Sequence, residues 1–416
     1  MKILFIVPYV PNLIRVRPYN ILRSLSARGH QITLLTLVSD QQDLADLEQI
    51  KPYCHAIHTV QMSKKNSIIN CLKVVPSRTP FQSVYSWQPS LLKLAGDLDK
   101  FDVVHVEHLR GAQYGLALKQ HSHLPVIWDS VDCITHLFRQ AVAKSEDFVR
   151  RWRSRLDLKR TEWFEGWAIN QFDHVLVTSK LDKTQLLALD NQPQALTAPI
   201  TVLPNGVDFD YFQPNPAIPT DANTLVVTGK MSYHANISMS LHLVHDIMPR
   251  VWQQNPAVKL LVVGKDPTPE IAELNQHPAI TVTGTVPDIP PYLHQATLAV
   301  APITYNAGIQ NKILEAMACG TAVVTTSQAI SSLNIQPKQE IAIADTPEDF
   351  SQAILKLLRD EQTRQEMAKA GYTYVRNHHN WETIAHNLES IYLETMHAKK
   401  YLTHTQTKQE QSLILN

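Results

Sequence analysis

The sequence carries no excess of charge of either sign, since Lys and Arg together number 38 and Asp and Glu also number 38. Proteins that bind nucleic acids in general usually present a net positive field, so this balance argues against nucleic acid as a partner. A charged partner must instead be attracted by a local patch of the surface.

Cysteine is scarce, and its four copies are far apart, at Cys54, Cys71, Cys133 and Cys319. They form no CxxC pair and no Cys/His metal spacing, so we expect free thiols in a reducing compartment rather than disulfides. No acidic pair or histidine cluster has ligand spacing either, and the sequence therefore predicts no metal site.

Long apolar runs are also missing. A helix that spans a bilayer needs about 20 consecutive apolar residues, and no segment approaches that length. The apolar run near the N-terminus, residues 3–7, is too short for a signal peptide and is typical of a buried first strand. We therefore expect a cytoplasmic protein.

The chain does contain enough apolar residues to fill two cores, since 44% of its 416 residues are hydrophobic and 18% are charged. This length predicts two domains of about 200 residues each. Short apolar runs alternate with segments of helical period, which indicates an α/β fold with helices covering parallel sheets. The expected strands are residues 3–7, 31–37, 56–60, 103–106, 126–128, 174–178, 224–228, 258–263, 280–283, 298–302 and 322–325, and the expected helices include residues 19–28, 238–254, 310–318, 347–359, 361–374 and 381–399.

The most informative segment is residues 202–212, Val-Leu-Pro-Asn-Gly-Val-Asp-Phe-Asp-Tyr-Phe, which lies between the two expected domains. Pro204 fixes φ, Asn205 tolerates the left-handed region, and Gly206 lets the backbone approach a ligand closely. Two interpretations follow. The segment is a plain surface turn, because Asn-Gly turns are common, or it is a hinge at a ligand-binding cleft.

Together with residues 313–324, Ile-Leu-Glu-Ala-Met-Ala-Cys-Gly-Thr-Ala-Val-Val, this segment resembles the retaining, nucleotide-sugar-dependent glycosyltransferases of family 4. The resemblance extends over residues 1–395. It implies the GT-B architecture, in which two Rossmann-like domains with parallel sheets face each other across a cleft. It also implies transfer of a hexosyl unit from a nucleotide diphosphate sugar to an acceptor hydroxyl with retention, as in polysaccharide or glycolipid synthesis. The UDP- or GDP-linked donor would be a co-substrate, and no other cofactor is expected.

The expected domain boundaries follow from this architecture. Residues 1–200 would form the acceptor-binding domain, and residues 201–380 the nucleotide-sugar domain. In this family the last helix crosses back onto the first domain, so residues 381–400 are expected to do the same. The polar residues 401–416 are expected to be a disordered tail.

The loop after the expected strand 298–302 leads into the helix that contains Glu315. Backbone N–H groups of Gly308, Ile309 and Gln310 could cradle a diphosphate there, although an ordinary strand–turn–helix would read the same way. Glu315 has apolar neighbours in sequence, which an unpaired carboxylate avoids. Hydrogen bonds from ribose hydroxyls would resolve that conflict, and the matching glutamate of the family does hold the ribose. The alternative is a glutamate exposed on the helix surface.

On the donor side, the sequence departs from the family at two positions. The first glutamate of the family's Glu-x7-Glu pattern, which lies near the transferred sugar, is replaced by Ala307. The family also has two cations about six residues apart that neutralise the leaving diphosphate. Lys230 matches the first of these, whereas the second is Asn236, so a helix N-terminus or another cation such as Lys312 must contribute. Lys230 could also be a solvated loop lysine.

The loop at residues 284–288 resembles the one whose backbone reads the nucleotide base, which leaves the identity of the base open. The complete set of expected donor-binding residues is Asn205, Gly206, Gly229, Lys230, Asn236, Gly284, Val286, Asn306, Gly308, Ile309, Gln310 and Glu315.

The acceptor side is expected at the strand ends of the first domain. Asn12, Arg15 and Arg17 follow the first strand, where many family members carry a Gly-Gly loop, and either arginine could supply positive charge or simply be exposed. Asp129 and Asp132 follow a later strand, near the position where the family often has a histidine. Asp132 is expected to act as a base or to orient the acceptor hydroxyl, and Lys230 is the second expected catalytic residue. Glu107 is a further candidate for acceptor contact, and a structural role fits it equally.

Residues 149–160 contain six cations and one acid in a helical stretch with apolar residues between them. This pattern fits attraction to anionic lipid headgroups, which suits a lipid-linked acceptor at the inner face of the membrane. It fits equally a solvated face whose apolar side chains point to the core.

Two other functions remain open. An enzyme of the same architecture could be a nucleotide-sugar 2-epimerase. A nucleotide-binding partner subunit without catalysis is favoured by Ala307 and Asn236, whereas retention of Lys230, Glu315 and residues 204–208 favours activity.

Overall fold

The structure is a computed structural model that describes residues 1–12, 15–144, 148–190, 198–303 and 310–414, with the side chains of 141, 143–156 and 402–414 excepted. The chain divides into an N-terminal unit, Met1–Pro204 with Trp381–Asn416, and a C-terminal unit, Asn205–Asn380. The division falls four residues after the boundary expected at residue 200. Each unit is described by itself below.

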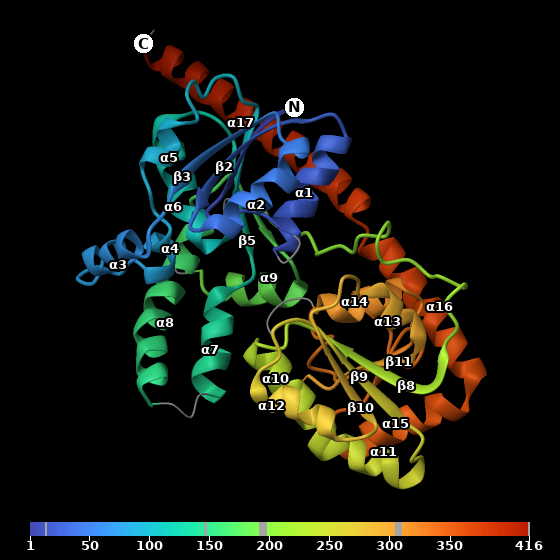
Figure 1. Cartoon of the computed structure of the whole chain (residues 1–416). Coiled ribbons are helices and arrows are strands. Elements are labelled where there is room, and N and C mark those ends of the chain that lie inside the picture. The colour runs from blue at the N-terminus through green and yellow to red at the C-terminus, as the bar shows by residue number, and fades with distance from the viewer. Residues whose placement is uncertain (13–14, 145–147, 191–197, 304–309, 415–416) are drawn as a thin grey trace. The chain divides into compact units, whose positions relative to one another are not determined.

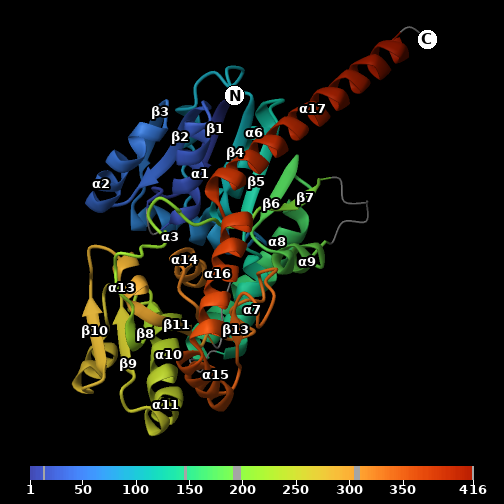
Figure 2. The same cartoon turned by 90° about the vertical axis from the view of Figure 1, so that its right-hand side faces the viewer.

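The N-terminal unit contains seven strands among its described residues (Figures 1 and 2). Its elements are β1 (Lys2–Val7), α1 (Val16–Ala27), β2 (Gln31–Val38), α2 (Gln41–Ile50), a 3₁₀ turn (Lys51–Tyr53), β3 (Ala56–Gln61), α3 (Lys64–Lys73), α4 (Phe81–Tyr85), α5 (Ser90–Lys93), β4 (Val103–Glu107), α6 (His108–His121), β5 (Val126–Val131), α7 (Ile134–Lys144), α8 (Phe148–Ala168), β6 (His174–Val177), α9 (Lys180–Leu187), β7 (Ile200–Val202) and α17 (Trp381–Ile414).

The sheet of this unit is parallel throughout and has the order β3-β2-β1-β4-β5-β6-β7. Its central strands are covered by helices on both faces, so their sequences are continuous apolar runs such as Ile3–Val7, which is buried at every residue. The strand order reverses between β1 and β4. In open parallel sheets ligands bind beyond the carboxyl ends of the strands at such a reversal.

Helix α17 packs on the N-terminal unit through a stripe of buried residues that includes Trp381, Leu388 and Tyr392. This is the helix that the family resemblance places on the first domain. The helix continues to Ile414, so the disordered tail expected from residue 401 is wrong for residues 401–414. The physical reason is that residues 381–416 contain neither glycine nor proline to end the helix.

The C-terminal unit has a second parallel sheet, of the order β10-β9-β8-β11-β12-β13, which reverses between β8 and β11. Its elements are β8 (Asp221–Thr228), α10 (His234–His242), a π-helical turn (Leu243–Ile247), α11 (Met248–Gln254), β9 (Lys259–Val263), α12 (Pro269–Glu273), a 3₁₀ turn (Leu274–Gln276), β10 (Ile280–Gly284), α13 (Pro290–Gln295), β11 (Ala296–Ala301), α14 (Asn311–Ala318), β12 (Val323–Thr325), β13 (Ala342–Ile343), α15 (Pro347–Arg359) and α16 (Glu361–His378).

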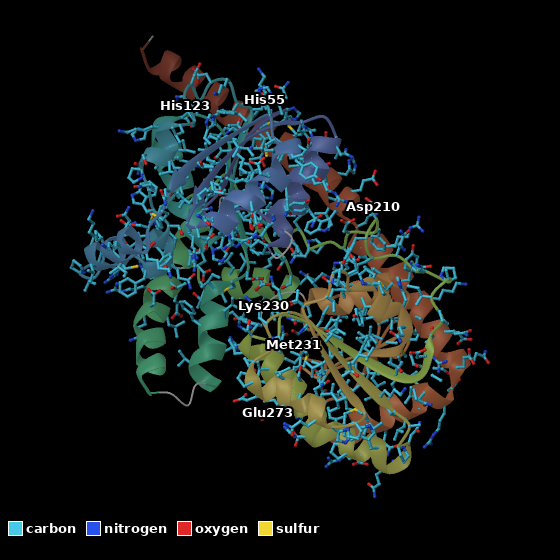
Figure 3. All side chains as sticks on the ribbon, in the orientation of Figure 1. His55, His123, Asp210, Lys230, Met231 and Glu273 are labelled. Carbon is cyan, nitrogen blue, oxygen red and sulfur yellow. The ribbon has the colours of Figure 1, made fainter. Side chains whose placement is uncertain are left out.

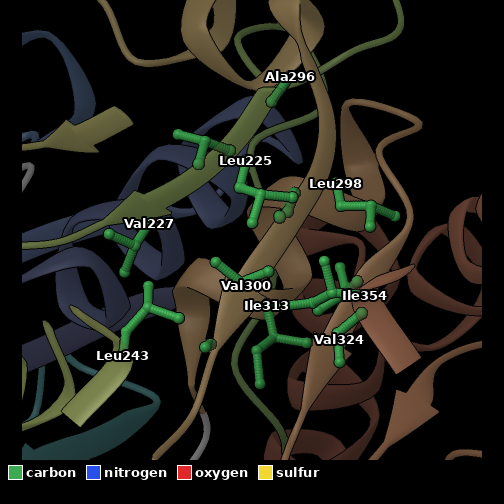
Figure 4. Close-up of a cluster of buried hydrophobic side chains, with 14 of the residues drawn as sticks. Leu225, Val227, Leu243, Ala296, Leu298, Val300, Ile313, Val324 and Ile354 are labelled. Atoms are coloured by element: carbon green, nitrogen blue, oxygen red, sulfur yellow. The ribbon is translucent and has the colours of Figure 1, made fainter. Parts of the chain in front are cut away.

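The core of this unit lies between the sheet and its helices (Figure 4). Leu225 of β8 and Val300 of β11 meet Ile313 of α14 and Ile354 of α15, and all are at most 2% exposed. Each such side chain contributes about 1.5–3 kcal/mol by burial. The core therefore fixes α14, and with it the residues that the helix carries toward the strand ends.

The structure confirms an α/β fold of two Rossmann-like units with parallel sheets. The helix expected at residues 238–254 instead begins at His234 and contains the π-helical turn before α11, whose first turn contains Pro249. Proline has no N–H to continue an α-helical ladder, which accounts for the break. Among the helices of the described chain, none is long and apolar enough to cross a bilayer.

Candidate functional site

Five of the candidate donor residues lie on either side of the strand reversal: Gly229, Lys230 and Asn236 after β8, and Gln310 and Glu315 after β11. Gly229 directly follows β8 and has φ at 155°, and a Cβ there would lie 2.7 Å from Nδ2 of Asn236. Gly264 follows β9 with φ at 153°, and its Cβ would lie 1.7 Å from the Gly229 carbonyl oxygen. Gly264 therefore requires glycine, because two loops pack backbone against backbone at this point, whereas a Cβ at Gly229 would collide with the Asn236 side chain.

Asn236 occupies the position of the missing family cation, and a cation nevertheless reaches it. Its Nδ2 donates to the carbonyl oxygen of Lys230 at 2.9 Å, and its Oδ1 accepts a short hydrogen bond from Nζ of Lys312 on α14. The amide thus connects the loop after β8 with the helix after β11. Lys312 brings its charge to the place where the family carries its second basic residue.

Lys230 lies in the loop after β8 and is labelled in Figure 3. Its side chain is 49% exposed, and its Nζ is 3.7 Å from Oδ2 of Asp266, which is itself 56% exposed. Exposed pairs of this kind are worth about 0–1 kcal/mol. This weak pair leaves the ammonium available to an anionic ligand.

Lys312 and Glu315 lie one turn apart on α14, and both are partly buried. Burial lowers the pKa of Lys312 to about 8 and raises the pKa of Glu315 to about 7, with the attraction between the two groups opposing both shifts. Within the described part of the chain, Glu315 accepts no side-chain hydrogen bond. A partly buried carboxyl in that state suits hydroxyl groups of a ligand.

The start of α14 has unsatisfied polar groups. Gln310, the residue before the helix, makes no capping side-chain hydrogen bond, and Oδ1 of Asn311 is buried without a hydrogen-bond partner among the described residues. The first N–H groups of a helix attract anions when they are not capped. The expected donor residues Asn306, Gly308 and Ile309, together with Ala307, lie outside the described residues.

The segment at residues 204–206 contains no left-handed residue. Neither Asn205 nor Gly206 has a positive φ, so the segment does not use the tolerance of Asn205 for the left-handed region. The segment is held by pairing instead. Nδ1 of His379 lies 2.7 Å from the Asn205 carbonyl oxygen, and the Val207 N–H donates to the His379 carbonyl oxygen at 2.7 Å.

The expected base-reading loop is fastened by a tyrosine from the informative segment. The Tyr211 hydroxyl donates to Oδ1 of Asp288 and accepts from the Ile289 N–H, both at 3.2 Å. Gly284 has φ at 66° with open space where a Cβ would be, and Val286 packs partly buried against the core. The loop therefore keeps an open backbone at Gly284, whereas the role of Tyr211 was missed from sequence.

In the N-terminal unit, polar residues meet at the strand reversal between β1 and β4. The Tyr9 hydroxyl donates to Oε1 of Glu107 at 2.8 Å. Glu107 is 1% exposed, and its Oε2 has no hydrogen-bond partner among the described residues. Burial, with a smaller contribution from Asp129, raises the pKa of Glu107 to about 8. At neutral pH this carboxyl is mainly protonated.

Two strained residues lie at the ends of the neighbouring strands β4 and β5. His108 has φ at 65° and Val131 has φ at 69°, and the pairing of β5 with β6 is irregular between Asp129 and Val131. A positive φ is a genuine outlier for a β-branched residue and costs about 1–3 kcal/mol. Such strain clusters at functional sites, so it marks these strand ends as a candidate site.

Asp132 follows the strained Val131. Its Oδ1 accepts from the Thr178 hydroxyl at 3.2 Å, and its side chain is partly buried. Burial, followed by repulsion from Asp182, raises the pKa of Asp132 to about 7. A carboxyl with this pKa can exchange a proton near neutrality, which suits the catalytic role expected for it.

Two residues expected on the acceptor side, Arg17 and Asp129, have side chains that are 4% and 0% exposed and that pair with each other. Nη2 of Arg17 is 2.8 Å from Oδ2 of Asp129, and Nη1 donates to the Leu203 carbonyl oxygen at 3.0 Å. Nε2 of His105 is 3.6 Å from the same carboxylate. The pair joins α1, β5 and the residue after β7, which is a structural role.

Arg15 and Asn12 lie beside this centre. The Arg15 guanidinium lies 4.6 Å from the ring centroid of Tyr9 and donates to the Val10 carbonyl oxygen at 3.1 Å, while the side chain is 43% exposed. Asn12 donates to Asp46 at 2.6 Å, which gives it a structural contact. Of the two, Arg15 remains a source of positive charge next to Tyr9 and Glu107.

A buried carboxylate that caps α7 was missed from the sequence. Oε1 and Oε2 of Glu165 accept from the N–H groups of Ile134 and Thr135 at 2.9 and 2.8 Å. Asp182 similarly accepts from the Cys133 N–H at 3.0 Å. The first turn of α7 is thereby satisfied from within the unit. The sequence does not indicate this cap, because Glu165 lies 31 positions after Ile134 and on another helix.

The basic segment 149–160 lies on α8, and the side chains of 149–156 are outside the description. Asp157 accepts from the Phe81 N–H at 2.9 Å, and Arg160 donates to the carbonyl oxygens of Val74 and Val75. Asp157 and Arg160 therefore connect α8 to the chain around α3 and α4. Among the side chains that the structure describes, no group of three or more His, Cys, Asp or Glu residues has the geometry of a metal site.

Two family models match the chain. A model described as Glycosyltransferase Family 4 matches residues 15–211, and one described as Glycosyl transferases group 1 matches residues 222–360. Among sequence relatives, glycogen synthase of Mycobacterium tuberculosis is 24% identical over 307 residues, which is 70% of this chain and 68% of the relative. Phosphatidyl-myo-inositol mannosyltransferase of the same organism is 25% identical over 216 residues, which is 48% of this chain and 56% of the relative.

Solved structures resemble the whole chain. Sucrose-phosphate synthase from Thermosynechococcus elongatus superposes with a TM-score of 0.66 at 18% identity, covering 96% of this chain and 100% of the other. HepE from Anabaena, solved in complex with UDP and glucose, gives a TM-score of 0.62 at 14% identity, covering 94% and 99%. These similarities establish the GT-B fold. With both family models matched in order along the chain, the protein belongs to the glycosyltransferases of family 4.

Proposed function

We propose that this glycosyltransferase moves a hexosyl unit from a UDP- or GDP-linked sugar to an acceptor hydroxyl with retention, in polysaccharide or glycolipid synthesis. The observation that carries the proposal is the contact of Lys312 with Asn236, beside Lys230 and Glu315 at the ends of β8 and β11. Two comparisons support it. HepE, which shares the fold, was solved with UDP and glucose. Two sequence relatives are named as a glycogen synthase and a mannosyltransferase, and both names describe glycosyl transfer.

The donor's diphosphate is the anion that this arrangement suits. Two lysines, Lys230 and Lys312, lie on the two sides of the strand reversal, and the first turn of α14 adds uncapped N–H groups. Donors that are already in place when negative charge develops on a leaving group lower the barrier for its departure. Lys312 would thus supply the positive charge that the family carries at the position of Asn236. The proposal includes no metal or other cofactor.

Glu315 would bind the ribose. Its carboxyl lies on α14 three residues beyond Lys312, and burial keeps its pKa near neutrality. A group of this kind can both accept from and donate to vicinal hydroxyls. The exposed backbone around Gly284 would read the base edge, which is consistent with either UDP or GDP.

The acceptor would be bound by the N-terminal unit at the ends of β4 and β5. Asp132, with a pKa of about 7, would orient the acceptor hydroxyl, and the leaving phosphate would take the proton in a front-face reaction. Glu107 and Arg15, which meet at Tyr9, would provide further polar contacts.

We also propose that the protein works in the cytoplasm at the inner face of a membrane. The six cations of residues 149–160 support attraction to anionic headgroups. The related mannosyltransferase, whose name specifies a phosphatidylinositol acceptor, supports a lipid-linked acceptor for this chain.

Thermal-shift titration tests the donor site, because a ligand that binds only the folded state raises the melting temperature in proportion to its affinity. UDP or GDP should raise it, and Glu315→Ala should abolish most of the shift. Glu273→Ala, at an exposed glutamate of α12 labelled in Figure 3, is the control that should retain it. No shift with UDP, GDP or ADP would reject the proposed donor site.

NMR of the donor separates the alternatives. A retaining transferase gives a product whose new linkage has the anomeric configuration of the donor, and hydrolyses the donor at most when acceptor is absent. A 2-epimerase would change the sugar without acceptor. Tight nucleotide binding with no consumption of donor in the presence of extract-derived acceptors would identify a partner subunit, to which Ala307 and Asn236 point.

A further inference from the structure

Helix α3 exposes its apolar face. Ile68, Ile69 and Leu72 are 57%, 48% and 64% exposed, and Val75, just beyond the helix, is 51% exposed. Their spacing places them along one side of the helix, the side that a helix of a water-soluble domain normally turns toward its core. In α3 the buried residue is Ser67 instead. We call these four residues with Lys64, Lys65, Lys73 and Arg78 the α3 surface.

The outward orientation of this face is fixed by contacts on the other side of the helix. Nδ2 of Asn70 donates to the Trp87 carbonyl oxygen at 2.7 Å, and the Cys71 thiol lies 3.8 Å from the Phe81 carbonyl oxygen. The Arg160 guanidinium holds the carbonyl oxygens of Val74 and Val75 at the C-terminal end of the helix. The exposed apolar stripe therefore belongs to the folded unit, and α3 carries it at the periphery of that unit (Figure 1).

The charge around α3 has a single sign, although the chain as a whole is balanced. Residues 49–96 contain no Asp or Glu, and they contain the cations Lys51, Lys64, Lys65, Lys73, Arg78 and Lys93. The four cations of the α3 surface are all exposed. Exposed apolar residues rimmed by cations match an interface whose interior is apolar and whose headgroups are negative.

We propose that the α3 surface docks on an anionic lipid bilayer. Ile68, Ile69 and Leu72 enter the boundary between headgroups and acyl chains, and the surrounding cations contact lipid phosphates. A second copy of the chain is a poor occupant, because a two-fold contact would bring the like charges of Lys64 and Lys65 together with those of the other copy. This surface shares no residue with segment 149–160, although Arg160 of that segment donates to the carbonyl oxygens of Val74 and Val75.

Vesicle co-sedimentation of the full chain tests the proposal, with phosphatidylcholine vesicles that contain or lack phosphatidylglycerol. The unmodified protein should bind the anionic vesicles, and the double variant I69Q/L72Q should bind at least tenfold more weakly. Each basic residue near an anionic surface is worth about fivefold in affinity, so K64Q/K65Q should lose about 25-fold at low salt. L44Q, at an α2 residue that is 53% exposed, is the matched control and should bind like the unmodified protein.

Four outcomes would overturn the proposal. The first is equal binding by the unmodified protein and I69Q/L72Q, and the second is binding that ignores phosphatidylglycerol. The third is binding lost only when Arg150, Arg151 and Arg153 are replaced by Gln, which would assign docking to α8. A dimer that I69Q/L72Q converts to a monomer, with no vesicle binding, would likewise assign the surface to a second copy. The UDP-induced thermal shift of each variant shows separately whether the donor site is intact.

Discussion

Nζ of Lys312 donates a hydrogen bond to Oδ1 of Asn236, a residue 76 positions earlier in the chain. Asn236 in turn donates to the backbone of Lys230, so one amide connects the two lysines of the proposed diphosphate site. The contact explains how a family 4 chain can lack the second cation of its motif. The positive charge comes from α14 and reaches the same position.

Replacing Lys312 with Val should lower kcat/KM for the donor by about 10²–10³-fold, because one preorganised donor to the leaving group is removed. Adding Asn236→Lys to that variant places a cation at the family position and should recover most of the loss. Steady-state kinetics with the donor that gives the largest thermal shift provides the measurement.

The matched control for this pair is Lys259→Val, which removes an exposed lysine at the start of β9. It should leave kcat/KM within about twofold. If K312V/N236K is as inactive as K312V, the cation is not interchangeable between the two positions, and the explanation of Asn236 fails.

Replacing Arg17 with Met should destabilise the protein by about 3–5 kcal/mol, because Asp129 would be left as a buried charge without its partner. The double variant R17M/D129N removes both charges and should regain much of that loss. Urea denaturation of the two variants measures the difference. Equal stability of R17M and the unmodified protein would show that the pair is not a structural element.

The sequence predicted those strands correctly whose burial on both faces gives a continuous apolar run. Strands such as β1 are covered on both faces, so a continuous apolar run identifies them. The edge strands β7 and β13 were missed because they contain three and two residues, too few to show a pattern. The end of α17 was misjudged because polar composition does not stop a helix that lacks glycine and proline.

The sequence can indicate site residues that belong to a motif, but not side chains that come together only in the folded structure. Lys230 and Glu315 were proposed from the sequence because each matches a family motif, in the loop after β8 and on the helix after β11. The pairing of Arg17 with Asp129 joins residues 112 positions apart, and neither sequence context signals it. For Lys312 and Asn236, the sequence suggested that Lys312 could replace the missing cation, but it did not signal the contact between the two side chains. Side chains that meet only through the sheet topology cannot be paired from spacing alone.

Gly264→Ala should destabilise the protein by several kcal/mol, because its Cβ would lie 1.7 Å from the carbonyl oxygen of Gly229. Gly284→Ala is the comparison, since its Cβ would meet nothing within 4 Å and only the positive φ is strained. That strain costs about 1–2 kcal/mol. Melting temperatures rank the two variants, and similar values would mean that the loops after β8 and β9 can separate freely.

The raised pKa of Glu107 should make the free energy of unfolding decrease as the pH rises. Its pKa is raised from 4.5 to about 8 in the folded protein, so the folded state holds more protons than the unfolded chain between these values. The free energy of unfolding then decreases from about pH 5 to about pH 8, by at most about 5 kcal/mol. Glu107→Gln, which mimics the protonated acid and still accepts from Tyr9, should flatten this decrease. Parallel pH profiles for the two proteins, from denaturation at pH 5.5 to 8.5, would contradict the shift.

Asp132→Asn should lower kcat by about 10²-fold or more and leave the UDP-induced thermal shift unchanged, because the residue is proposed to act on the acceptor and not on the donor. The pH dependence gives a second measurement. With a pKa of about 7, Asp132 loses its proton as the pH rises through neutrality, so kcat should rise about tenfold per pH unit below 7 and level off above it. D132N should lose that dependence. If D132N instead weakens UDP binding, or keeps the rise through pH 7, then the ionisation that controls the rate belongs to another group and Asp132 does not orient the acceptor.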